Sequence, residues 1–170
     1  MYEISVTRRS IRDLEFLSRT FPKVFREEVL QTLDLIDARL TKEIVEKTPR
    51  GVGGQAGLAG SIHGEVVQFG RSYLDRIGTP LEYAPVIEVG RRPGQRRPPV
   101  GPIALWARRK LGLPSDEAER AAYAISIAIG RRGFPGRFMF ERTAEENDNW
   151  VRSQLSGLPD RIRGRIYGAG

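Results

Sequence analysis

The stretch that decides the fold is residues 22–47, PKVFREEVLQTLDLIDARLTKEIVEK. Its large apolar residues recur every three or four positions, which places them on one face of an α-helix of about six or seven turns. Pro22 suits the first turn of a helix, and Thr48-Pro49 ends it, because a residue before proline avoids the helical conformation. We interpret the stripe as packing on the domain's own sheet, although it also fits a seam with a partner helix. The stripe consists of Phe25, Val29, Leu33, Ile36, Leu40 and Ile44.

The chain that follows this helix changes to glycine-rich and then to β-like sequence. Residues 51–60, GVGGQAGLAG, predict a flexible loop, and their position after a helix argues against a dinucleotide-binding loop, which follows a strand. Glycines separate the next short segments, whose composition is typical of strands. We therefore predict an antiparallel sheet of three or four strands, with a break or an edge at Pro85, because proline cannot donate to a strand ladder. The expected strands cover residues 61–70, 72–79 and 82–89, and residues 2–6 suggest a further short one.

We expect helices before and after this sheet region in the sequence, which makes the fold class α+β. We predict a single domain over residues 1–156, with the loop 50–60 and an arm 90–100 as extensions. A basic tail, residues 157–170, follows it. Besides the helix at 22–47, the expected helices cover residues 8–20, 102–111, 115–130 and 138–155.

Composition excludes several classes of site. The 170 residues contain no cysteine, so disulfides, zinc thiolates, iron–sulfur clusters and a cysteine nucleophile are ruled out. His63 is the single histidine, which excludes a multi-histidine metal site. Carboxylate pairs such as Glu141 and Glu145 match no metal or catalytic motif. No apolar run reaches the roughly 18 residues of a membrane helix. We expect a soluble, intracellular protein that is not an enzyme and uses no cofactor or metal.

The net charge of +7 comes mainly from the middle of the chain. Residues 61–113 carry nine basic and four acidic groups, and residues 89–100, VGRRPGQRRPPV, contain four arginines and no acid. Arginine binds phosphate well because its planar guanidinium offers paired donors, but the same groups also suit acids on a neighbouring subunit. Both uses remain open at this point. The candidate contact residues are Arg91, Arg92, Arg96 and Arg97 in the arm, and Arg108 and Arg109 at the end of the following helix.

The order of several short motifs resembles one protein family. After Thr48-Pro49 come Gly57-Leu58-x-x-Ser61-Ile62, Tyr83-Ala84-Pro85, Glu88-Val89-Gly90, Trp106 to Gly112, Ile129 to Gly133 and the Phe134–Phe138 turn. This order resembles the tail-completion proteins (minor tail components, or neck proteins) of lambda-like, long-tailed bacteriophages, over about residues 24–145. Three features depart from the family pattern: Ala56 where the family has threonine, the long Arg/Pro-rich stretch 91–100, and Phe138-Met139-Phe140 at the end.

The resemblance implies a structural virion protein of the head–tail junction, present in the host cytoplasm during assembly. Such proteins join filled heads to tails as a ring, commonly of six copies. Their partners are the connector or stopper on the head side and the tail terminator or tail tube. Double-stranded DNA passes through the channel that they surround, and no membrane is involved. The alternative is a non-specific, basic DNA-binding protein.

Under the ring hypothesis, subunits meet head to tail, so arginines of one subunit should face acids of the next. We expect the loop, the arm and the tail to make contacts between subunits or adjacent rings. Candidate acidic partners lie on the long helix: Glu27, Glu28, Asp34 and Asp37.

Overall fold

A computed structural model describes residues 8–49, 57–70 and 72–168 of the chain. The protein is mostly helical, with 69% of the described residues in helices. It divides into two compact units. Unit 1 comprises residues 1–43, 63–78 and 141–170, and unit 2 comprises residues 44–62 and 79–140. The strand expected at residues 2–6 and the glycine-rich stretch 51–56 lie outside the described residues.

Unit 1 is built on the predicted long helix, which is confirmed as α2, Pro22–Lys47. Three further helices contribute to this unit: α1 (Arg8–Thr20), α7 (Met139–Ser156) and α8 (Leu158–Tyr167). On α2 the apolar stripe faces inward as expected, with Val29 and Ile36 buried. Leu17, Val151 and Ile162 from the other three helices are buried as well. The interior of unit 1 is therefore assembled from both ends of the sequence.

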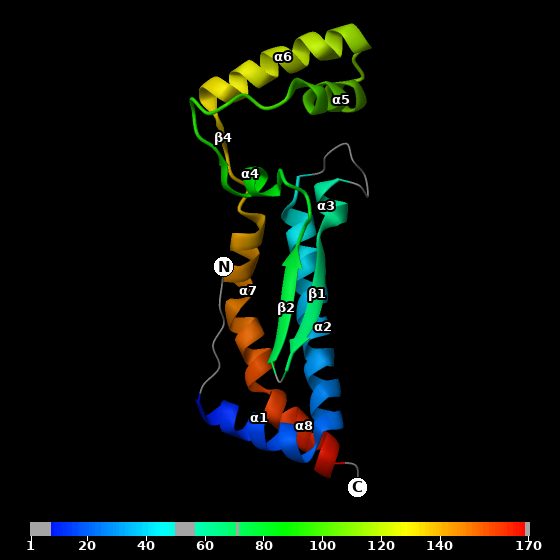
Figure 1. The fold of residues 1–170 in the computed structure, drawn as a ribbon, viewed down its shortest axis with the longest axis vertical. Coiled ribbons are helices and arrows are strands. Elements are labelled where there is room, and N and C mark those ends of the chain that lie inside the picture. Colours follow the sequence, from blue (N-terminus) through cyan, green and yellow to red (C-terminus); the bar gives the residue numbers. More distant parts are fainter. Residues whose placement is uncertain (1–7, 50–56, 71, 169–170) are drawn as a thin grey trace. The chain divides into compact units, whose positions relative to one another are not determined.

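The sheet of unit 1 is a single antiparallel hairpin. Strand β1 (His63–Phe69) pairs with β2 (Ser72–Gly78), with Val66 opposite Asp75. The hairpin runs alongside α2 (Figure 1). The backbone of Gly64 lies so close to the Asp37 carboxylate that a Cβ atom would overlap it. A side chain at this position would require the Asp37 carboxylate to move.

The prediction of three or four strands in one sheet is wrong. Besides the hairpin, the described residues contain only a two-residue ladder, β3 (Gly90–Arg91) with β4 (Phe134–Pro135). Residues 82–89, expected as a strand, form the short helix α4, Ala84–Val89. The physical reason is Pro85, which lies in the first turn of α4, where a missing N–H costs nothing.

The basic tail folds onto unit 1 as α8. Arg161 extends to α2, where its Nε donates to Glu28 Oε1 at 2.9 Å and its Nη2 donates to Thr32 Oγ1 at 2.9 Å. The ring of Tyr167 meets Phe21 edge-on, with centroids 6.3 Å apart. Residues 158–167 are thus held to α2 by ionic and polar contacts, and to Phe21 just before α2 by an aromatic contact.

Unit 2 combines α3 (Leu58–Ser61), α4 and the β3–β4 ladder with a pair of helices, α5 (Val100–Leu111) and α6 (Ser115–Arg132). The two helices lie side by side (Figure 1). Small residues form their contact, which allows close approach of the backbones. These residues are Ala104 and Ala107 on α5, and Ala118 and Ala122 on α6, all buried. Within the described ranges, no helix is both long enough and apolar enough to span a membrane.

Candidate functional site: the crossover and the arginine pole

Two segments far apart in sequence cross in unit 2, and we call residues 88–92 together with 133–140 the crossover. The β3–β4 ladder pairs Gly90 with Pro135 and Arg91 with Phe134. Two more backbone hydrogen bonds extend it, from Arg137 N to Ile87 O at 2.9 Å and from Phe138 N to Glu88 O at 3.0 Å. The crossover therefore fixes the start of the arm against the end of α6 and the start of α7.

Glycines make this close crossing sterically allowed. A Cβ atom on Gly133 would overlap the backbone oxygen of Arg91, and one on Gly136 would overlap the backbone oxygen of Glu88. Gly90 would clash in the same way with the backbone of Phe134 and Gly136. Gly90 and Gly133 also have φ of +76° and +67°, with extended ψ, a conformation that is nearly exclusive to glycine.

Glu88 joins the crossover to the first turn of α7. The backbone N–H of Phe140 lies 3.1 Å from Oε1 and 3.2 Å from Oε2 of the Glu88 carboxylate. A carboxylate at a helix start satisfies an otherwise unpaired N–H and interacts favourably with the helix dipole. Met139 beside it is fully buried, with its sulfur 3.2 Å from Thr48 Oγ1. Glu88, Gly90, Gly133 and Thr48 belong to the motifs quoted above, and all of them pack backbone or cap a helix here.

The arm is not a loose extension, because it is bonded along the second half of α6. Gly94 N donates to Gly130 O at 2.9 Å, and Ser126 Oγ donates to Pro98 O at 2.8 Å. The Cγ atom of Arg97 lies directly over Gly130, only 2.8 Å from where a Cβ would stand. Within the arm, the Arg91 guanidinium donates to the backbone oxygen of Arg96. Residues 94–98 are thus held along α6 by backbone and side-chain contacts.

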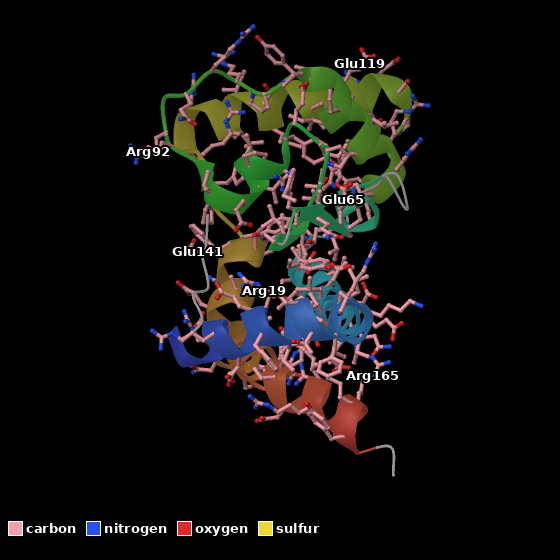
Figure 2. All side chains as sticks on the ribbon, turned by 60° about the horizontal axis from the view of Figure 1, so that its bottom comes forward. Arg19, Glu65, Arg92, Glu119, Glu141 and Arg165 are labelled. Carbon is pink, nitrogen blue, oxygen red and sulfur yellow. The ribbon has the colours of Figure 1, made fainter. Side chains whose placement is uncertain are left out.

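This packing brings arginines from two segments to one end of unit 2. Arg131 and Arg132 lie in the last turn of α6, between Gly130 and Gly133, and both of these glycines contact the arm. In the part of the chain that the structure describes, no acidic side chain pairs with these arginines or with those of the arm. Five of them are exposed and Arg91 is half-buried. Figure 2 shows Arg92 at the margin of unit 2. We call this cluster the arginine pole: Arg91, Arg92, Arg96, Arg97, Arg131 and Arg132.

The six arginines proposed from the sequence do not form one group. The four in the arm belong to the arginine pole, but Arg108 and Arg109 lie in the last turn of α5, beside the start of α6 rather than its end. Sequence reasoning did not assign Arg131 and Arg132 to the site. The pair of glycines that flanks them, Gly130 and Gly133, was the available signal, because glycine in or beside a helix often marks a close backbone approach.

The two units differ sharply in charge. Unit 1 has 15 basic and 15 acidic residues, whereas unit 2 has 13 basic and 6 acidic residues. The whole excess of +7 is therefore carried by unit 2. Many acids of unit 1 are already paired with arginines of the same unit. These pairs are Glu28 with Arg161, Glu27 with Arg165, Asp13 with Arg163, Glu43 with Arg39, and Asp148 with Arg152.

These pairs bear on the acids of α2 that were expected to meet arginines of a neighbouring subunit. Glu27 and Glu28 bind arginines of α8 in their own chain, at 2.8 and 2.9 Å. Asp37 accepts a hydrogen bond from Thr41 Oγ1 at 2.9 Å and lies against Gly64. At least three of the four acids are thus engaged within unit 1.

One carboxyl group in unit 1 has a strongly shifted pKa. Burial of Asp75, followed by repulsion from Asp37 and Asp34, raises its pKa from 3.8 to about 6. Its Oδ1 atom is buried and makes no hydrogen bond to the described residues. Across those residues, no group of three His, Cys, Asp or Glu side chains is placed to hold a metal ion. We therefore interpret Asp75 as a half-buried packing residue rather than a ligand.

No protein-family profile matches this chain, and neither does any curated protein or solved structure.

Proposed function

We propose that this protein is a structural component of the neck of a long-tailed bacteriophage, where copies form a ring that joins head to tail around the DNA. The observation that carries the proposal is the crossover. The residues that gave the resemblance, Glu88, Gly90 and Gly133 among them, meet there and serve backbone packing and helix capping. Motif residues that serve packing and capping support a fold shared with the tail-completion proteins that the sequence resembles. Those proteins are assembly proteins.

The division of charge supports the same proposal. A subunit that lies beside DNA can contact the phosphates through one basic surface while the rest of its body stays neutral. Unit 1 is neutral and largely self-paired, and unit 2 carries the excess of positive charge. In the proposed ring, unit 1 supplies the contacts to neighbouring subunits and rings, namely the connector or stopper and the tail terminator or tube. Unit 2 presents its arginines to the molecules that lie next to it in the assembly.

A second candidate function is a non-specific DNA-binding protein outside the virion, and the arginine pole is the observation that favours it. The two functions predict different outcomes when the protein is missing. A neck protein is needed at one step, the joining of two finished structures. A DNA-binding protein acts on the genome, so its loss changes DNA content or replication and leaves the joining step intact.

The test is to delete the gene from the phage genome and examine induced lysates by negative-stain electron microscopy. We expect DNA-filled heads and complete tails that remain separate, with joined particles restored by the wild-type protein supplied from a plasmid. Two plasmid variants sharpen the result. Gly133→Ala disrupts the crossover and should not restore joining, whereas Gly101→Ala, at an open position in α5, should restore it. Joined, infectious particles in the deletion strain would rule out the neck function.

A further inference from the structure

We infer that the arginine pole is a preformed binding surface for the phosphate backbone of duplex DNA, without sequence specificity. The inference rests on the proposed function for its setting, a channel through which duplex DNA passes, and it adds the residues that meet the DNA. It concerns six residues: Arg91, Arg92, Arg96, Arg97, Arg131 and Arg132.

The surface is ordered before any partner arrives. Three independent contacts hold the arm on α6: Gly94 to Gly130, Ser126 to Pro98, and Arg97 Cγ over Gly130. A loose basic loop would lose conformational freedom on binding, which weakens affinity. Here that cost has already been met in folding, so the arginines are presented on a fixed backbone.

The charges of the arginine pole point to an external anion as the partner. Arg92, Arg96, Arg97, Arg131 and Arg132 have no acidic partner in the described part of the chain. In another copy, many acids of unit 1 are paired internally, and the exposed acids of α6, Asp116, Glu117 and Glu119, lie at its first turns, at the opposite end from Arg131 and Arg132. The arginines are therefore available to an external polyanion, and the poly-glutamate comparison below tests an acidic protein surface as the alternative.

The composition of the arm distinguishes nucleic acid from an acidic protein surface as the partner. Stable protein interfaces depend on a buried centre of apolar or aromatic side chains. The arm from 91 to 99, RRPGQRRPP, has arginine, proline, glycine and glutamine only. Protein–DNA interfaces are instead polar and strongly positive, and arginine can bind phosphate through two parallel N–H donors. The composition of the arm therefore favours phosphate.

The arginine pole presents no helix or strand pair that could read bases in a groove. Sequence-specific proteins insert a helix or a strand pair into the major groove. In the arginine pole the arginines come from an irregular segment and from the C-terminal turn of α6, whose last residues are followed at once by the crossover. Contacts to the backbone alone give affinity that depends on salt and not on sequence.

The experiment measures binding of the full-length protein to a short fluorescein-labelled duplex by anisotropy, over a series of KCl concentrations. The test variant is Arg92→Gln/Arg96→Gln/Arg97→Gln, since glutamine keeps the Cγ that packs on Gly130 while removing charge. Each phosphate contact contributes about 0.9 to the slope of log K against log salt, so three lost contacts should reduce the slope by roughly 2.7.

A matched control removes three charges from unit 1. Arg19→Gln/Lys23→Gln/Arg26→Gln alters exposed residues near the junction of α1 and α2, and none of them has an acidic partner within the described ranges. We expect this variant to keep the wild-type slope. Circular dichroism of both variants should match wild type, which separates lost contacts from lost folding.

Three results would overturn the inference. The wild-type protein fails to bind the duplex at low salt, the test variant keeps the wild-type slope, or poly-glutamate at equal anion concentration binds more tightly than DNA. The last result would identify an acidic protein as the partner. Failure here is distinct from failure of the neck function, because the deletion phage tests joining without reference to DNA affinity.

Discussion

Replacing Gly133 by alanine tests whether the crossover is as tightly constrained as its geometry indicates. The added Cβ would overlap the backbone oxygen of Arg91 and stand 3.0 Å from the backbone carbon of Arg92. Neither atom belongs to a side chain that can rotate away, so the two segments have to separate. The residue also has φ of +67° and ψ of −165°, a conformation that alanine adopts only with strain.

Two costs add at this position. The backbone conformation costs a non-glycine residue about 1–3 kcal/mol, and forcing an extra methyl into a packed site costs about 1–3 kcal/mol. We therefore expect Gly133→Ala to lower the free energy of unfolding by about 4 kcal/mol. For a chain of this size, each kcal/mol shifts the melting temperature by about 2–4 °C, so the expected drop is about 8–16 °C.

Substitutions at two other glycines of unit 2 measure the cost of the backbone conformation apart from the cost of the added methyl group. Gly112 has φ of +68° but nothing within 4 Å of a Cβ, so Gly112→Ala carries the backbone term alone, about 1–2 kcal/mol. Gly101 lies in α5 without a positive φ and also in open space, so Gly101→Ala should be neutral or stabilising by up to about 1 kcal/mol. Urea unfolding followed by circular dichroism measures all three. A Gly133→Ala protein as stable as Gly112→Ala would show that the crossover has room and that the reasoning is wrong.

Three further substitutions test other parts of the structure. Arg161→Ala should lower the free energy of unfolding by about 2 kcal/mol, because it leaves the buried Glu28 carboxylate short of a charged hydrogen bond; urea titration should show the loss, and Arg161→Lys should recover part of it. Glu88→Ala should cost about 1–2 kcal/mol by removing the acceptor of Phe140 N, and a melting temperature equal to wild type would contradict the capping role. Asp75 has a raised pKa in the folded protein, so its contribution to stability is fully present below pH 3.8 and is lost as pH rises through about 6. Asp75→Asn should therefore match wild type at low pH and exceed it in stability above pH 6, and equal urea midpoints above pH 6 would refute this.

Local patterns in the sequence were sufficient for the five longest helices, but they did not predict α3, α4 or α8. The spacing of Val29, Ile36 and Ile44 fixes the buried face of α2, and Thr48-Pro49 fixes its end, because helix formation depends on neighbours within a few residues. The strand expected at 82–89 failed for a local reason as well. Apolar runs as short as APVIEV suit a strand or a helix equally, and Pro85 in a first helical turn decided the outcome.

The composition of the sequence by itself also determined that the protein has a net charge of +7 and lacks cysteine, and its motif order suggested a family. Only the tertiary structure shows that unit 2 carries this excess charge. It also shows that Arg131 and Arg132 lie at the end of α6 that contacts the arm, whereas Arg108 and Arg109 lie at the end of α5, beside the start of α6. The physical reason is that the crossover depends on contacts between residues more than 40 positions apart, such as Gly90 with Pro135. No local periodicity encodes such a pairing. The glycines that permit it act by the absence of a side chain, which becomes visible only when the partner backbone is in place.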